Sequence, residues 1–177
     1  MMKRIMKKMI AAVMVTGALT LSPIAASYDQ MPSSFANVVE AKAAPDVDLQ
    51  DLRNGEMTCV EVLHAGKPLF LNFWASWCPP CVGEMPHIQK MYEKYGDRIN
   101  IAAVSIDDNE GDAIAYIKEA GLSLPTYYGD VQKIGKAYQI EAIPLSLIVS
   151  PSGEIIAEHL GGMSESEMDS FIQSALK

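Results

Sequence analysis

The chain has 177 residues, which suits one domain, and its 49% hydrophobic and 20% charged residues are close to globular averages. A chain of this size can bury a core without disulfide staples. Four of its 14 Lys and Arg residues lie among the first 26, so residues 27–177 carry ten basic against 22 acidic residues, a net charge of about −12. This acidic balance argues against binding to nucleic acid or to an anionic membrane surface.

The first 26 residues have the pattern of an export segment. Basic residues at positions 3, 4, 7 and 8 precede an apolar run over 9–21, and small residues follow at 24–26. We predict a signal peptide or N-terminal membrane anchor over 1–26, with a second small-x-small motif at 41–43 as an alternative cleavage site. Residues 27–45 show no sustained period and are expected to be a linker without structure. The location is then periplasmic or otherwise extracytoplasmic, and residues 46–177 form the domain.

The first half of the domain predicts a hairpin followed by a βαβα unit. Apolar residues from Val47 to Val62 are interrupted by Asn54-Gly55, a strong turn dipeptide, which favours a short β-hairpin. Residues 69–75 form a nearly unbroken apolar run, typical of a buried central strand. A helical period then continues to Gly96, which is expected to end the helix in the left-handed conformation. A strand over 99–106 and a helix capped by Asn109 follow.

The second half predicts a helix, a hairpin and a last helix. Asp130 can cap a helix that ends before Ile140. Strands over 145–149 and 154–159 are joined by turn residues 150–153. Ser164 and Glu167 form a capping box before the last apolar stripe. The order of elements indicates an α/β fold, a central mixed sheet flanked by helices with an N-terminal β-hairpin extension.

The motif Cys78-Pro79-Pro80-Cys81 lies where the buried strand meets the following helix. A pair so close in sequence constrains the unfolded chain little, so stapling explains it poorly. The partial positive charge of a helix N-terminus favours a thiolate at Cys78. The prolines fit the first helical positions but supply no N–H donors to that sulfur. Cys78 is therefore the predicted nucleophile, and Cys81, one turn along, the residue that resolves the mixed disulfide.

Further residues are candidates around this pair. Glu84, three residues beyond Cys81, could accept the proton of Cys81, although a solvated surface glutamate is an equal alternative. A cis bond at Ile143-Pro144 would expose backbone near Cys78 for a partner strand. Trp77 is the expected surface anchor and Trp74 is expected in the core. We expect a partner to bind against five residues, Trp77, Pro79, Pro80, Ile143 and Pro144.

Two other interpretations concern metal and the third cysteine. Zinc requires four ligands, and outside the motif only Cys59, His64, His87 and His159 remain, without a second paired motif. We therefore expect no metal and no cofactor. Cys59 is expected to be a small buried hydrophobe, with a redox role as the alternative.

The stretch from Asn72 to Cys81, with Pro86 after it and Ile143-Pro144 downstream, resembles thioredoxins, and most closely the exported TlpA/ResA-like thioredoxin family. The resemblance runs from about residue 45 to the end. It implies a thioredoxin-like fold with a four- or five-stranded sheet, a cis Pro144 beside the dithiol, an insertion over 122–139 and an acid at Glu84. Thioredoxin itself has a buried aspartate where Asn72 stands, so proton handling should fall to Glu84. Leu145 replaces a common threonine and is expected to alter the surface that a partner strand meets.

The expected function is that of an exported thiol-disulfide oxidoreductase. The resemblance implies a reductase that passes electrons to disulfide-bonded exported proteins, of the cytochrome c maturation or methionine sulfoxide reductase recycling type, and that is recharged by a membrane thiol electron donor. The first alternative is an oxidase that donates its disulfide, as DsbA does, because the two residues between the cysteines do not fix the reduction potential. The second is a non-catalytic partner-binding or metal-delivery module. A peroxidase is disfavoured because no Thr-x-x-Cys arrangement of that type is present.

Overall fold

The computed structural model describes residues 42–176. The expected signal peptide or anchor over 1–26 and most of the expected linker lie outside the described residues. None of the helices in the described part is long and apolar enough to cross a membrane. In chain order, the elements are β1 Lys42–Ala43, β2 Asp48–Asp51, β3 Met57–Cys59, α1 Val60–His64, β4 Leu69–Trp74, α2 Pro79–Tyr95, β5 Asn100–Ser105, α3 Glu110–Glu119, β6 Thr126–Tyr128, α4 Val131–Tyr138, β7 Leu145–Val149, β8 Glu154–Leu160 and α5 Glu165–Ser174.

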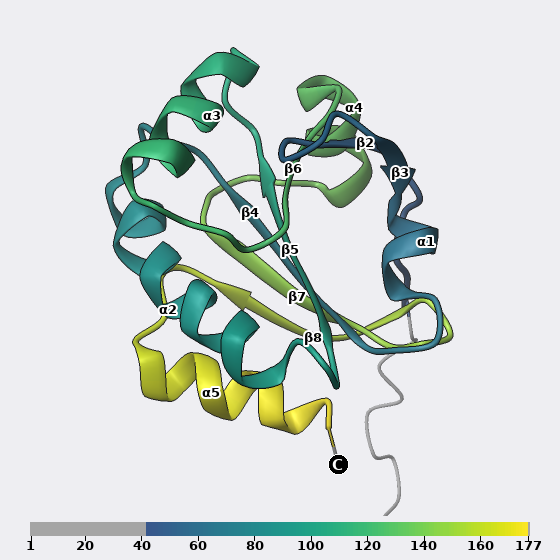
Figure 1. The fold of residues 1–177 in the computed structure, drawn as a ribbon. Coiled ribbons are helices and arrows are strands. Elements are labelled where there is room, and N and C mark those ends of the chain that lie inside the picture. Colours follow the sequence, from purple (N-terminus) through teal and green to yellow (C-terminus); the bar gives the residue numbers. More distant parts are fainter. Residues whose placement is uncertain (1–41, 177) are drawn as a thin grey trace, which may run out of the picture. The chain divides into compact units, whose positions relative to one another are not determined.

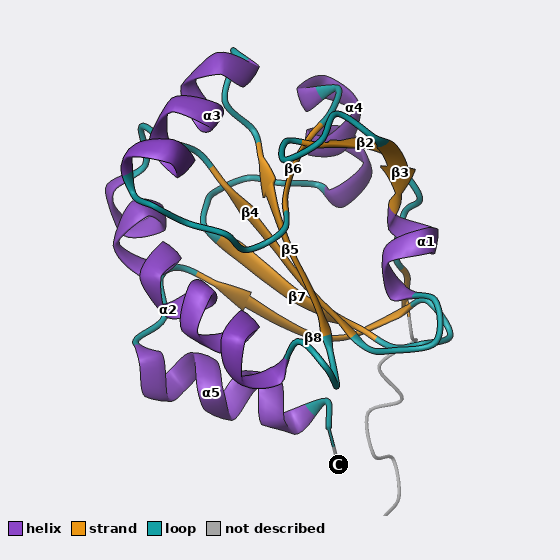
Figure 2. Ribbon diagram, viewed as in Figure 1, coloured by secondary structure: helices purple, strands orange, loops and turns teal. Residues whose placement is uncertain are grey.

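The strands of residues 42–176 form one mixed sheet in the order β1-β8-β7-β4-β5-β6-β2-β3. Strand β4 lies in its middle, parallel to β5 and antiparallel to β7 (Figure 1). Helices lie on both sides of the sheet (Figure 2). The predicted α/β architecture with a central mixed sheet is confirmed.

The side chains of β4 alternate between two apolar layers, which explains its nearly unbroken apolar run. Phe70 and Trp74 pack with residues of α2 and α5 on one face. Leu71 and Phe73 pack with residues of α4 on the other face. Because every residue of β4 is buried, the strand is fixed on both sides, and its carboxyl end holds the start of α2 in place.

The predicted helix starts are confirmed by side-chain caps. Asn109 accepts a hydrogen bond from the N–H of Gly111 at the start of α3, and Asp130 accepts one from Lys133 in α4. At α5, Ser164 and Glu167 form the complete capping box. The end of α2 differs from the prediction, because Gly96 has φ −61° and not the left-handed conformation.

The N-terminal hairpin is confirmed, although its second strand is shorter than expected. Strands β2 and β3 pair antiparallel from Asp48, opposite Cys59, across a turn that contains Gly55 with φ 78°. Residues 60–64 form α1 instead of extending β3. The end of the expected linker also carries structure, because Lys42 and Ala43 pair with the start of β8.

The sheet is wider than the four or five strands that the resemblance implies. Strand β6, which was not predicted, lies in the expected insertion over 122–139 and pairs parallel to β5. Its other edge pairs with β2, so β6 joins the N-terminal hairpin to the rest of the sheet. Three residues are too few for a hydrophobic period to reveal a strand.

Candidate functional site

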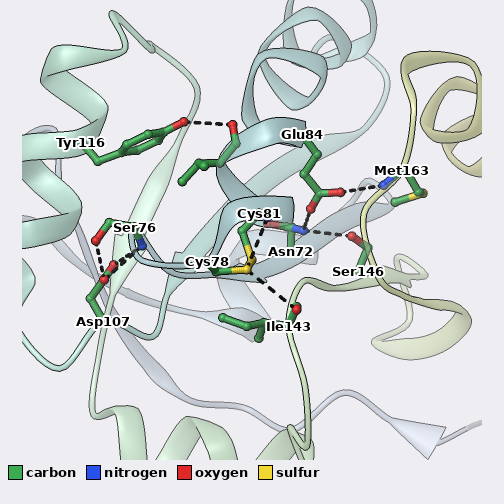
Figure 3. The surroundings of a disulfide bond; sticks show 11 residues. Asn72, Ser76, Cys78, Cys81, Glu84, Asp107, Tyr116, Ile143, Ser146 and Met163 are labelled. Carbon is green, nitrogen blue, oxygen red and sulfur yellow. Dashed lines mark hydrogen bonds between the residues drawn. A yellow bond between two sulfur atoms is a disulfide. The ribbon is translucent and has the colours of Figure 1, made fainter.

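A disulfide between Cys78 and Cys81 lies at the junction of β4 and α2 (Figure 3). Cys78 occupies the N-cap position of α2, and Cys81 lies in its first turn. The residues are 3% and 0% exposed. The predicted pair is thus in bonding contact, with Cys78 the slightly more accessible of the two.

The N-terminus of α2 supplies one hydrogen bond to Cys78. Pro79 and Pro80 occupy its first positions and have no N–H groups, as expected. The first available amide is that of Cys81, which donates to Sγ of Cys78 over 3.3 Å. The two prolines were predicted from the sequence, but this donor was not. In the reduced protein, the bond and the positive end of the helix dipole would both favour a thiolate at Cys78.

The predicted partner-binding residues surround the disulfide unequally. The Ile143-Pro144 bond is cis, as predicted, and the carbonyl oxygen of Ile143 lies 3.9 Å from Sγ of Cys78. Trp77 is 64% exposed, so its side chain is free to contact a partner, whereas Trp74 is in the core. Pro79 and Pro80 are exposed, Ile143 is half-buried and Pro144 is buried.

Leu145 does not alter the outer surface as expected. Its side chain is buried in the apolar layer that includes Phe73 and Tyr138. Leu160 of β8 is the register partner of Leu145. Its side chain, unlike that of Leu145, is exposed.

Glu84 is buried near the disulfide and is not a surface glutamate. It is 2% exposed, and Oε2 accepts a 3.0 Å hydrogen bond from the backbone N–H of Met163. Oε1 accepts a 2.9 Å bond from Nδ2 of Asn72. Burial raises the pKa of Glu84, while these two bonds and the charge of His87 act in the opposite direction. A carboxylate with a raised pKa one turn from Cys81 is suited to accept a proton.

Two buried polar residues beside Glu84 were not among the predicted site residues. Asn72 on β4 and Ser146 on β7 are register partners, and Nδ2 of Asn72 donates to Oγ of Ser146 over 3.0 Å. Both are fully buried. Asn72 was visible in the sequence as the polar interruption of an apolar run, and Ser146 interrupts the next apolar strand in the same way.

A second buried carboxylate fixes the loop that leads to Cys78. Asp107 accepts hydrogen bonds from the backbone N–H of Ser76 at 3.0 Å and from its hydroxyl at 2.7 Å. The hydroxyl of Ser105 donates to the other carboxylate oxygen over 2.7 Å. Asp107 therefore ties the end of β5 to the loop after β4. It was not among the predicted site residues.

The remaining cysteine and histidines do not assemble a metal site within the described residues. Cys59 is half-buried and unpaired. His87 lies on α2, with Nδ1 3.2 Å from the carbonyl oxygen of Met163. It thus contacts the same residue as Glu84.

Comparisons with known proteins agree with this arrangement. Residues 41–158 match the AhpC/TSA family. The chain is 32% identical to the thiol-disulfide oxidoreductase ResA of Halalkalibacterium halodurans, over 88% of this chain and 89% of that protein. It belongs to the TlpA/ResA-like thioredoxin family. Its ResA relative in Bacillus subtilis is 28% identical over 94% of both chains. Membership identifies the chain as a thiol-disulfide oxidoreductase.

Solved structures confirm the thioredoxin-like fold. StoA from Bacillus subtilis superposes with a TM-score of 0.63 and 26% identity, over 73% of this chain and 97% of that one. A thiol:disulfide interchange protein DsbE from Chlorobium tepidum gives a TM-score of 0.70 at 24% identity, over 77% and 97%. The second similarity supports the fold alone.

Proposed function

We propose that this chain is an exported dithiol reductase that passes electrons from a membrane thiol donor to disulfide-bonded exported proteins. The observation that carries the proposal is the Cys78–Cys81 pair at the N-terminus of α2, with exposed Trp77 beside it. The ResA relatives are named thiol-disulfide oxidoreductases, which supports the chemistry. Partners of the cytochrome c maturation or methionine sulfoxide reductase type, and an export function for residues 1–26, are part of the proposal.

The reaction consists of two exchanges. The thiolate of Cys78 attacks one sulfur of the partner disulfide, whose S–S bond breaks, and the other partner sulfur leaves as a thiolate and takes up a proton. Cys81 then loses its proton to Glu84 and attacks Sγ of Cys78. The mixed disulfide breaks, the second partner thiolate leaves, and Cys78 and Cys81 form the disulfide seen here. Two electrons have passed to the partner.

The place of the partner follows from the surface around Cys78. The carbonyl of Ile143 lies beside the sulfur, so an extended partner segment can pair with the backbone there while its cysteine reaches Cys78. Trp77, Pro79 and Pro80 provide an exposed apolar surface next to it, against which the partner packs.

Insulin reduction tests the dithiol mechanism. The protein, supplied with dithiothreitol, should accelerate insulin precipitation, and Cys78→Ser should return the rate to the uncatalysed background because the nucleophile is lost. Cys59→Ser is the matched control and should keep full activity, since Cys59 is unpaired and outside the motif. Activity that survives Cys78→Ser would refute the mechanism and favour a non-catalytic binding module.

Trapping in cells tests the direction and the partner. Cys81→Ser removes the thiol that resolves the mixed disulfide, so complexes through Cys78 should accumulate and be released by dithiothreitol. If the cysteines of the captured partners become more oxidised when the gene is deleted, the protein acts as a reductase. Captured partners that instead become more reduced on deletion would identify an oxidase and contradict the proposal.

A further inference from the structure

Asn72 has an unbalanced set of hydrogen bonds. Its amide nitrogen donates to Oε1 of Glu84 at 2.9 Å and to Oγ of Ser146 at 3.0 Å. Its oxygen, Oδ1, is buried and has no hydrogen-bond partner among the described residues. A buried polar atom without a partner costs free energy, and an apolar residue in this central strand would avoid that cost.

The orientation of the amide follows from the carboxylate that it faces. An ionised carboxylate can only accept hydrogen bonds, whereas a serine hydroxyl can accept or donate. Turning the amide over would place Oδ1 against the carboxylate of Glu84 and leave two N–H groups without partners. The observed orientation is therefore the one that suits an anionic Glu84, and Ser146 accepts the second N–H and holds the amide in it.

We propose that Asn72, held by Ser146, is a positioning residue that keeps Glu84 ionised and therefore available as a proton acceptor in its buried site. This inference rests on the proposed role of Glu84 in deprotonating Cys81. Neither Asn72 nor Ser146 touches the sulfurs in this mechanism, and both act through the carboxylate. Figure 3 shows Asn72 between Glu84 and Ser146.

Both oxygens of Glu84 already accept a hydrogen bond, Oε1 from Nδ2 of Asn72 and Oε2 from the N–H of Met163. Hydrogen bonds donated to a carboxylate are stronger than those donated to the neutral acid, so each of them favours the ionised form. Asn72 thus opposes protonation directly.

Other groups around Glu84 also bear on its charge. On α2 these are the thiols of Cys78 and Cys81 in the reduced protein and the imidazole of His87, whose charge lowers the pKa of Glu84. On the sheet, His159 of β8 is a titratable residue and lies opposite Ser146 in the strand register. In the oxidised protein neither cysteine affects the titration of Glu84, because disulfide sulfurs do not titrate.

Carbon-13 NMR of the oxidised protein tests the inference without any exchange reaction. The carboxyl signal of Glu84 is assigned by its loss in Glu84→Gln and followed with pH. In Asn72→Leu the titration midpoint should rise by about one pH unit, the size of one hydrogen bond to a charged group. Ser146→Ala should raise it by less, because the amide keeps its bond to Glu84 but loses its second acceptor.

Thr126→Val is the matched control, since it removes a buried hydroxyl on another strand that donates to the carbonyl of Leu124. Its midpoint should equal that of the wild type. If Asn72→Leu does not fold, the titration midpoint of Glu84 in Ser146→Ala decides the test. A wild-type midpoint in every folded variant overturns the inference.

The rate of mixed-disulfide resolution separates this inference from the proposed function. If the NMR midpoint of Glu84 and the midpoint of the pH profile of resolution both move to higher pH in the variants, the inference about Asn72 and the proposed role of Glu84 both stand. If the NMR midpoint moves while the pH profile of resolution is unchanged, Asn72 positions the charge of Glu84 but Glu84 is not the proton acceptor, and the proposed role of Glu84 fails alone.

Discussion

One backbone amide donates a hydrogen bond to the sulfur of Cys78. Two prolines occupy the positions where a helix normally offers its first N–H groups, so the amide of Cys81 becomes the first donor and bonds to Sγ of Cys78. The same residue therefore supplies the resolving sulfur and the hydrogen bond that would stabilise the attacking thiolate. The spacing of three residues places both functions in the first turn of α2.

The buried charge of Glu84 should make stability depend on pH. Burial raises the pKa of Glu84 above its ordinary value of 4.5, so between the unfolded and folded pKa values the folded protein binds more protons. Its contribution to stability is then greatest at low pH and is lost as the pH rises through the folded value. Glu84→Gln should remove this part of the slope of unfolding free energy against pH, measured by urea denaturation of the oxidised protein.

The control for that measurement is Glu119→Gln, at an exposed position of α3. It should leave the slope between pH 4 and neutral pH, roughly the range over which buried carboxyls titrate, as in the wild type. A Glu84→Gln protein with the wild-type slope would show that Glu84 keeps its ordinary pKa when folded.

At the scale of elements, α2 contains Pro86 without being interrupted. Proline has no N–H, so the carbonyl of Val82, four residues earlier, lacks its usual helical donor. The hydroxyl of Tyr116 on α3 donates to that carbonyl over 3.1 Å. The bond compensates the proline and ties α3 to the helix that carries the two cysteines.

A double-mutant cycle tests this compensation. Tyr116→Phe should destabilise the protein by about 1 kcal/mol, the usual cost of a lost hydrogen bond that leaves a carbonyl unpaired. In a Pro86→Ala background, the new N–H can bond to Val82, so the same substitution should cost less. Urea denaturation of the four proteins measures the coupling energy, and equal costs in both backgrounds would exclude the compensation.

Element boundaries show where local sequence signals suffice. Caps at Asn109, Asp130 and Ser164 were predicted from side chains that bond to backbone a few residues away. Gly96 was expected to provide a left-handed residue, but a Cβ there would lie 2.7 Å from the carbonyl oxygen of Tyr92. The glycine is required by this close approach, which a sequence pattern does not reveal.

At the scale of the whole molecule, the width of the sheet depends on pairings between distant segments. Strand β6 has three residues and is extended because β5 and β2 flank it. Strand β1 has two residues and pairs with β8, more than 100 positions later. Such strands have no amphipathic period of their own, and tertiary contacts override weak local preference.

Spacing, local hydrogen bonding and hydrophobic period in the sequence were enough to predict the dithiol, its place between a buried strand and a helix, the three capped helices and both hairpins. The burial of Glu84, and the convergence of Asn72, Ser146 and Met163 around it, became visible only in the folded chain. Ser146 and Met163 lie 74 and 79 residues from their partners in this network. No local pattern encodes contacts of that separation, since they arise when β4, β7 and the loop before α5 pack around one helix.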